Sequence, residues 1–299
     1  MGRATRPLAD HVSPPPDPAA SAAPAASLAP AAPAEKSHAW RPSRFMLIVA
    51  HPDDADFGPA ATAARWIDEG SEGWLVCCTS GDQGGEDHAA DPLELAALRE
   101  AEQRVAAAIV GYRGVSFLHQ PDGALANDLA LRELLVREIR TFKPDAVLAT
   151  DPETLFYGDG GINHVDHRAA AMAAVDAVYP ASRNPMAFPW LARDGLAPHN
   201  VRRMYLFWSN APTVRVDVSA TIDRKIEALR AHASQIKHPE RLETRIRDWA
   251  REEGEPIGAA AAEALRVIVI EEDADEGPLG SDAPSGIADG SEGASGVEA

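Results

Sequence analysis

Two short clusters of histidine and aspartate hold the residue types that could carry out metal-assisted chemistry. The first, His-Pro-Asp-Asp, occupies positions 51–54, and the second, His-Val-Asp-His, occupies positions 164–167. Imidazole nitrogens and a carboxylate oxygen are a ligand set that zinc takes in proteins, and three protein ligands leave a fourth position open for water. The two clusters together therefore indicate a zinc-type site.

Spacing within each cluster suggests a division of roles. His164 and His167 lie three residues apart, so on a helix they share a face. Both could bind a metal, or one could bind it while the other faces a substrate. Asp53 and Asp54 are adjacent and point in different directions. One carboxylate could then hold the metal while the other takes a proton from water that the metal has acidified.

A purely structural interpretation competes with this one. Asp54 or Asp56 could cap a helix, and Asp166 could lie in the first turn of another. That interpretation is good for any one residue taken alone. It is poor for two such clusters that each follow a predicted strand and its polar loop.

The surrounding pattern predicts the elements that would bring the clusters together. An almost wholly apolar segment at 44–50 indicates a strand buried on both faces, as in a parallel sheet. The first four strands alternate with helices, which predicts an α/β, Rossmann-like three-layer domain with a mainly parallel sheet. Carboxyl ends of parallel strands share one edge, so the site is expected there. The sequence predicts strands near 44–50, 73–80, 115–119, 146–150, 204–208, 214–218 and 267–270, and helices near 56–69, 91–110, 128–142, 163–178, 219–235, 240–253 and 258–265.

These motifs resemble those of the LmbE/PIG-L family of zinc-dependent de-N-acetylases. The resemblance rests on Ala-His-Pro-Asp-Asp at 50–54 with the buried strand before it, Thr-Ser-Gly-Asp at 79–82, and His-x-Asp-His at 164–167. It extends from about 44 to 270. It implies a hydrolase that removes an N-acetyl group from an N-acetylglucosamine-type amino sugar through a zinc-activated water, releasing acetate and a free amine.

The resemblance also assigns roles within the first cluster and part of the second. It makes His51, Asp54 and His167 the zinc ligands and Asp53 the general base. The same ligand set admits iron or cobalt. Two positions depart from the usual family pattern: Ala55 stands where Glu is common, and Val165 stands where Pro is common. Neither position is a ligand, so the implied chemistry is kept.

Further roles follow from the same resemblance. His164 would protonate the leaving amine or stabilise the oxyanion, with Asp166 orienting its ring. Arg99 and Asp122 are the candidates for holding sugar hydroxyls, and the alternative for Arg99 is an ion pair with Glu102 or a neighbouring helix.

Composition bounds the rest of the chain. Of its 299 residues, positions 1–42 are rich in Ala, Pro and Ser, and positions 271–299 are acidic and lack Lys and Arg. Both segments are expected to be disordered tails around a deacetylase-like domain at 43–270. Half of the net charge of −18 lies in the second tail, so the folded part is only moderately acidic, and the chain lacks the clustered Lys and Arg that a nucleic-acid partner needs.

Location and partners can be inferred more coarsely. No segment resembles a membrane span or a secretory signal, so a cytoplasmic protein is expected. The adjacent Cys77 and Cys78 are expected to be reduced core residues. The expected partner is a small N-acetylated amino sugar, and the oligomeric state stays open, a homo-oligomer included.

Three alternative functions can be weighed against the deacetylase. A zinc amidase acting on a larger N-acyl or thiol conjugate would use the same residues. A non-catalytic sugar- or nucleotide-binding α/β domain is disfavoured because the glycine-rich segments at 81–85 and 157–161 lack the spaced glycines of a dinucleotide loop. A zinc nucleobase deaminase is disfavoured because its paired cysteine ligands are missing.

Overall fold

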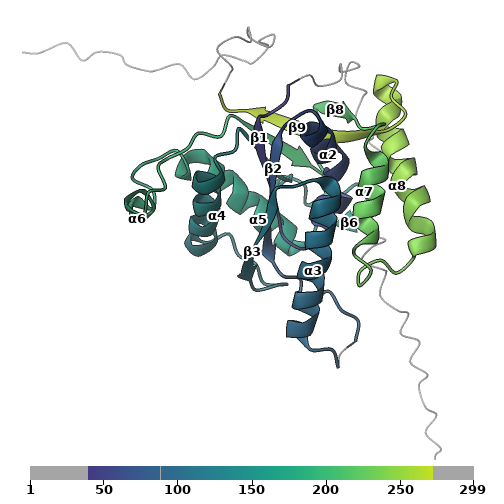
Figure 1. Ribbon diagram of the computed structural model, residues 1–299, viewed down its shortest axis with the longest axis horizontal. Coiled ribbons are helices and arrows are strands. Elements are labelled where there is room, and N and C mark those ends of the chain that lie inside the picture. The colour runs from purple at the N-terminus through teal and green to yellow at the C-terminus, as the bar shows by residue number, and fades with distance from the viewer. Residues whose placement is uncertain (1–39, 88, 272–299) are drawn as a thin grey trace, which may run out of the picture.

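A seven-stranded sheet lies between two layers of helices (Figure 1). The computed structural model describes residues 40–87 and 89–271. The elements in chain order are β1 (Arg44–Val49), α1 (Asp54–Phe57), α2 (Ala60–Asp68), β2 (Glu72–Thr79), α3 (Pro92–Val110), β3 (Gly114–Gln120), α4 (Leu129–Phe142), β4 (Ala146–Thr150), β5 (Phe156–Tyr157), β6 (Gly161–Ile162), α5 (Val165–Asp176), the π-helical turn η2 (Ala177–Ala181), α6 (Pro189–Arg193), β7 (Arg203–Phe207), β8 (Val214–Asp217), α7 (Ile222–Arg230), α8 (Pro239–Gly254), the 3-10 turn η3 (Glu255–Ile257) and β9 (Ala262–Val269).

The sheet has the strand order β3-β2-β1-β4-β7-β9-β8. The first five strands in this order pair in parallel, whereas β9 pairs antiparallel with both β7 and β8. The predicted mainly parallel α/β sheet is therefore confirmed. The chain leaves β1 toward β2 on one side and reaches β4 on the other, so the order reverses between β1 and β4. In open α/β sheets, ligands bind beyond the carboxyl ends of the strands at such a reversal.

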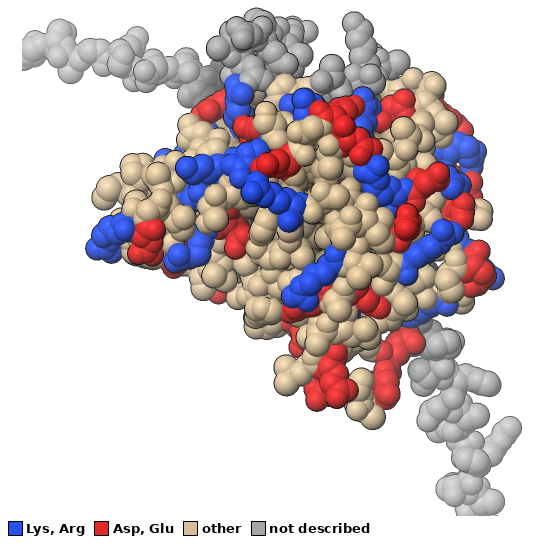
Figure 2. Space-filling model, in the orientation of Figure 1, with Lys and Arg blue, Asp and Glu red and all other residues tan. Residues whose placement is uncertain are grey.

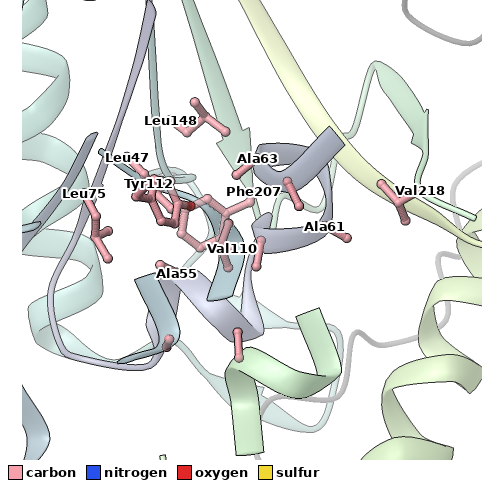
Figure 3. Close-up of a cluster of buried hydrophobic side chains, with 14 of the residues drawn as sticks. Leu47, Ala55, Ala61, Ala63, Leu75, Val110, Tyr112, Leu148, Phe207 and Val218 are labelled. Atoms are coloured by element: carbon pink, nitrogen blue, oxygen red, sulfur yellow. The ribbon is translucent and has the colours of Figure 1, made fainter. Parts of the chain in front are cut away.

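Central strands are buried because helices cover both faces. Helices α4 and α5 cover one face, and α2, α3, α7 and α8 lie on the other (Figure 1). In β1, Phe45 and Leu47 face the second group of helices while Met46 and Ile48 face the first, as the two core clusters show. Figure 3 shows part of the larger cluster, where Leu47, Leu75 and Leu148 of adjacent strands lie near Tyr112 and Phe207. This packing fixes the strand ends that carry the site.

Three predicted helices differ from the structure. The helix expected at 56–69 is divided at Gly58-Pro59 into α1 and α2, because proline has no N–H to continue the hydrogen-bond ladder. The helix expected at 219–235 ends at Arg230. The helix expected at 258–265 is wrong: Gly258 has φ +70°, and the alanine-rich segment after it enters β9, paired between β7 and β8. Alanine propensity is overridden there by strand pairing.

The ends of the described fold lie close to the predicted domain limits of 43–270. Most of the expected tails at 1–42 and 271–299 lies outside the described residues. Trp40 nevertheless stacks on Tyr205 with ring centroids 6.0 Å apart, so the packed part includes this residue. Among the described residues, none of the helices is long and apolar enough to cross a membrane.

Charges of both signs are mixed over the described surface that faces the viewer in Figure 2. Acidic side chains gather at the lower edge, where α3 lies in Figure 1. Lys and Arg side chains adjoin one another at the upper left of this face, with acidic side chains beside them.

Candidate active site

The first predicted cluster forms a tight turn directly after β1. Asp53 has φ +94° and ψ −28°, which is a left-handed conformation for a residue with a side chain. Such a conformation costs on the order of 1–3 kcal/mol and persists only where its surroundings hold it. The turn places His51 and Asp54 on the carboxyl edge of the sheet. There the backbone N–H of His51 donates to the Asp54 carboxylate at 2.8 Å.

Asp54 lies between two imidazoles. One of its oxygens, Oδ1, is 3.0 Å from His167 Nε2, and the other, Oδ2, is 3.4 Å from His51 Nδ1. His51 follows β1, and His167 lies in the first turn of α5 after the β5–β6 hairpin. The structure thus brings together the three residues expected to bind a metal, from elements more than a hundred residues apart.

A second pair of carboxylates holds the opposite side of the His51 ring. His51 Nε2 lies 3.0 Å from Asp122 Oδ1 and 3.2 Å from Asp166 Oδ2. Asp166 in turn accepts the backbone N–H groups of Gly123 at 2.6 Å and Leu125 at 3.1 Å. The resemblance implies that Asp166 orients the ring of His164. The geometry differs, because the Asp166 carboxylate faces His51.

His164 stands over the other two histidines. Its ring centroid is 4.9 Å from that of His51 and 5.2 Å from that of His167. Its Nδ1 accepts the backbone N–H of Asp166 at 3.2 Å, and it caps α5 in this way. With Nδ1 engaged, Nε2 is the nitrogen left to face a substrate.

Arg99 is buried and contacts backbone carbonyls around the site. Its guanidinium donates to the carbonyl oxygens of Gly81 at 2.8 Å and Pro52 at 2.7 Å, and it lies 3.4 Å from the Asp53 carboxylate. These contacts join α3 to the loops after β1 and β2. Its expected role in binding sugar hydroxyls stays a prediction. The alternative pairing with Glu102 is not seen: the Arg99 contacts go to Gly81, Pro52 and Asp53, and Glu102 accepts from Ser234.

The two adjacent aspartates have opposite pKa shifts. Burial raises the pKa of the Asp53 carboxyl, and the Arg99 guanidinium opposes this rise only in part. Burial also disfavours the charged form of Asp54, but His167 and His51 outweigh it and hold the pKa of Asp54 well below its ordinary value. Environments that separate the pKa values of two neighbouring acids are typical of sites where the acids have different roles.

Histidine pKa values also diverge. Burial lowers the pKa of His51, but the carboxylates of Asp54, Asp122 and Asp166 outweigh it and raise this pKa well above its ordinary value. Burial and the two neighbouring imidazoles lower the pKa of His164. His164 is therefore more readily neutral than His51.

A large cavity opens over this cluster. Its volume is about 1050 Å³, and it extends from the histidines between the loops after β1 and β2 and along α7 and α8. Pockets for small molecules usually have volumes of about 300–1,000 Å³, so this one has room for more than a single sugar ring. Every residue predicted for the site except Asp166 lines it, together with aromatic side chains that include Phe57, Tyr157, Trp208 and Trp249.

Trp208 is a site residue that the sequence reasoning missed. It follows β7 on the same edge of the sheet, has φ +55°, and lies with its ring centroid 5.4 Å from that of His167. Its position at the carboxyl end of the strand predicted at 204–208 was the available signal, since residues at the carboxyl ends of parallel strands collect at one edge.

The donor groups fit a metal ion. Ligand atoms of His51, His164 and His167 lie within 4.8 Å of one another, as do those of His51, Asp122 and Asp166. The buried Nδ1 of His167 has no hydrogen-bond partner within residues 40–87 and 89–271, while its Nε2 faces Asp54. Imidazole nitrogens around a carboxylate, with one imidazole held by further carboxylates, are the chemistry of a zinc-type site and its supporting residues.

An α/β sheet with such donors at the point where its strand order reverses is typical of a metal-dependent hydrolase. Comparisons with known proteins are consistent with this class. The family model described as "PIG-L: GlcNAc-PI de-N-acetylase" matches residues 46–178. A diacetylchitobiose deacetylase of Thermococcus kodakarensis is 29% identical over 228 residues, covering 75% of this chain and 83% of that protein.

Two further relatives have 30% identity. One is the 1D-myo-inositol 2-acetamido-2-deoxy-alpha-D-glucopyranoside deacetylase of Geodermatophilus obscurus, matched over 65% of this chain and 84% of its own length. The other is a solved structure of N,N'-diacetylchitobiose deacetylase from Pyrococcus horikoshii, with a TM-score of 0.70, covering 78% of this chain and 88% of that one. The chain belongs to the PIG-L family of de-N-acetylases, as its motifs predicted.

Proposed function

We propose that this protein is a metal-dependent N-deacetylase that hydrolyses the acetamide of an N-acetylglucosamine-type amino sugar. The observation that carries the proposal is the meeting of Asp53, Asp54 and the three histidines at the floor of one cavity. Relatives named as amino-sugar deacetylases support the substrate class.

His51, Asp54 and His167 would hold the metal, and zinc is the metal we propose. When bound, it would supply a Lewis acid that polarises the acetyl carbonyl and acidifies a water molecule. Asp53, whose pKa is raised and whose side chain is 16% exposed at the cavity, takes the proton from the attacking water.

His164 would act on the oxyanion or on the leaving amine. Its ring overlooks the cluster, where it can donate to the oxyanion or deliver a proton to the departing nitrogen. The water oxygen bonds to the acetyl carbon and the C–N bond breaks, so acetate and a free amine leave. Asp122 and Asp166 keep the His51 ring in place during these steps.

Metal analysis combined with a substrate screen tests the proposal. We expect about one metal per chain and release of amine from N-acetylglucosamine derivatives. Asp53→Asn should keep its metal and lose turnover by about 100- to 10,000-fold, the usual contribution of a general base. His51→Ala should lose the metal itself, and the exposed Asp223→Asn of α7 is the matched control that should change neither.

Three results would each contradict a different part of the proposal. A folded, metal-free preparation with full activity would exclude the mechanism. Tight sugar binding without release of acetate would favour the binding-module alternative. The cavity volume of about 1050 Å³ also admits larger conjugates, so release of amine only from bulky N-acyl substrates would favour the amidase.

A further inference from the structure

Three buried polar side chains form a connected chain behind Asp53. They are Gln103 of α3, Asp56 of α1 and His232 of the segment after α7, and each is completely buried, at 0% exposure. None of these three is among the residues that line the cavity. They therefore cannot touch a substrate directly, and the proposed mechanism leaves them without a role.

Hydrogen-bond directions along this chain are set by its chemistry. Gln103 Oε1 accepts the backbone N–H of Asp53 at 2.8 Å, and Gln103 Nε2 donates to Asp56 Oδ2 at 2.8 Å. His232 Nε2 lies 2.9 Å from the same Asp56 oxygen. Because a carboxylate only accepts, Asp56 fixes the amide of Gln103 with its nitrogen inward and its oxygen toward Asp53.

The bond from Gln103 is made to a strained residue. Asp53 has φ +94°, and a residue with a side chain rarely keeps this backbone conformation unless neighbouring groups hold it. Among the described residues, the Asp53 carboxylate has Arg99 as its side-chain partner, at 3.4 Å. The direction of the carboxylate is therefore set mainly by its backbone. The Asp53 carbonyl oxygen accepts the N–H groups of Asp56 and Phe57, and Gln103 accepts the Asp53 N–H.

We propose that Gln103 is a positioning residue for the reaction, with Asp56 and His232 fixing its amide. It keeps the Asp53 peptide in the left-handed conformation, and so keeps the carboxylate directed at the cavity floor. This inference rests on the proposed role of Asp53 as the base. It predicts that loss of the Gln103 oxygen impairs the proton transfer more than substrate binding.

The first test replaces Gln103 by methionine, which has similar length and no comparable acceptor. Gln103→Met should lower kcat by about 100-fold, the effect of misplacing a reacting group by about 1 Å. KM should stay within about two-fold, as for a loss confined to the transition state. Metal content should stay unchanged. In the Asp53→Asn background the same substitution should have little further effect on kcat, because it acts through Asp53.

A second test reverses the internal hydrogen bond. Gln103→Glu places two carboxylates face to face, and adding Asp56→Asn restores a donor opposite an acceptor while leaving an oxygen for Asp53 N–H. His232 Nε2, which faces the same atom of residue 56, then accepts from the new amide nitrogen, with its ring proton on Nδ1. The double variant should recover most of the turnover lost by Gln103→Glu. It also gives a folded protein to measure if the methionine variant fails to fold.

A matched control separates positioning from general stability. Thr221 is buried, and its hydroxyl donates to the Ala61 carbonyl oxygen at 2.8 Å, away from the site. Thr221→Val should lower the midpoint of thermal unfolding and leave kcat unchanged. A folded Gln103→Met with wild-type kcat, or with an equal further loss in the Asp53→Asn background, would overturn the inference alone. Full turnover in Asp53→Asn would overturn both this inference and the proposed function.

Discussion

Adjacent residues of the same type acquire different chemistry here because their surroundings differ. Asp54 is held between the His51 and His167 imidazoles, whereas Asp53 faces the Arg99 guanidinium and has a raised pKa. The motif predicted two roles for the two carboxylates, and family resemblance assigned them. The opposite pKa shifts agree with that assignment, and they depend on burial that no local sequence pattern specifies.

Asp122 provides a prediction at the scale of a single residue. Its carboxylate lies 3.0 Å from His51 Nε2, and interaction with His51 outweighs burial and lowers its pKa to about 2. Asp122→Asn should therefore weaken metal affinity by about 10- to 100-fold, because residues that orient a ligand imidazole have effects of this size. Competition with a chelator measures that affinity in the absence of substrate. If the affinity is unchanged and only KM rises, Asp122 binds the sugar instead, as the resemblance implies.

At the scale of elements, the sequence predicted the parts that depend on local pattern. Buried strands such as 44–50 and helix limits such as 91–110 follow from apolar runs, proline and capping aspartates, and the structure has them nearly in place. Only the first half of β9 differs from the prediction: the alanines at 258–265 favour helix, whereas the second half coincides with the strand predicted at 267–270. The pairing partners that make the first half a strand lie far away in the sequence. The contacts of Gln103 and Trp208 were missed for a similar reason, since they arise only when separate elements pack.

A buried ion pair joins three of these elements. Lys225 of α7 lies 2.7 Å from Glu263 of β9, and Glu263 also accepts the backbone N–H of Thr62 in the first turn of α2 at 2.7 Å. Glu263→Gln should lower the free energy of unfolding by about 3–5 kcal/mol, because it leaves a buried ammonium unpaired. Urea denaturation measures the change. Adding Lys225→Met should restore most of it.

The control for this ion pair is an exposed one. Arg113 and Glu72 lie 2.8 Å apart with side chains about half exposed, at 60% and 49%. Solvent screens such pairs, so Arg113→Gln should change the free energy of unfolding little. Equal losses in Glu263→Gln and Arg113→Gln would show that burial does not govern the contribution of the first pair.

At the scale of the whole molecule, the folded unit that we propose is slightly longer than the predicted 43–270. The Arg203 guanidinium lies 4.1 Å from the Trp40 ring centroid, and Ser71 Oγ donates to the Pro42 carbonyl oxygen at 2.6 Å. At the other end, Glu271 accepts from Arg183 at 2.8 Å. These contacts join both ends of the described chain to the rest of the fold, through residues that composition alone had assigned to tails.

A truncation series tests this unit. A fragment of residues 40–271 should match the full chain in its thermal midpoint and in kcat/KM, because every described contact of the site is retained. A fragment of residues 43–270 loses the contacts of Trp40, Pro42 and Glu271, and its free energy of unfolding should fall by about 1–3 kcal/mol, most of it from the packing of Trp40. Trp40→Ala in the full chain should reproduce most of that loss, with kcat unaffected because Trp40 lies outside the cavity lining. If the 40–271 fragment were inactive while folded, residues beyond the described fold would have to contribute to the site.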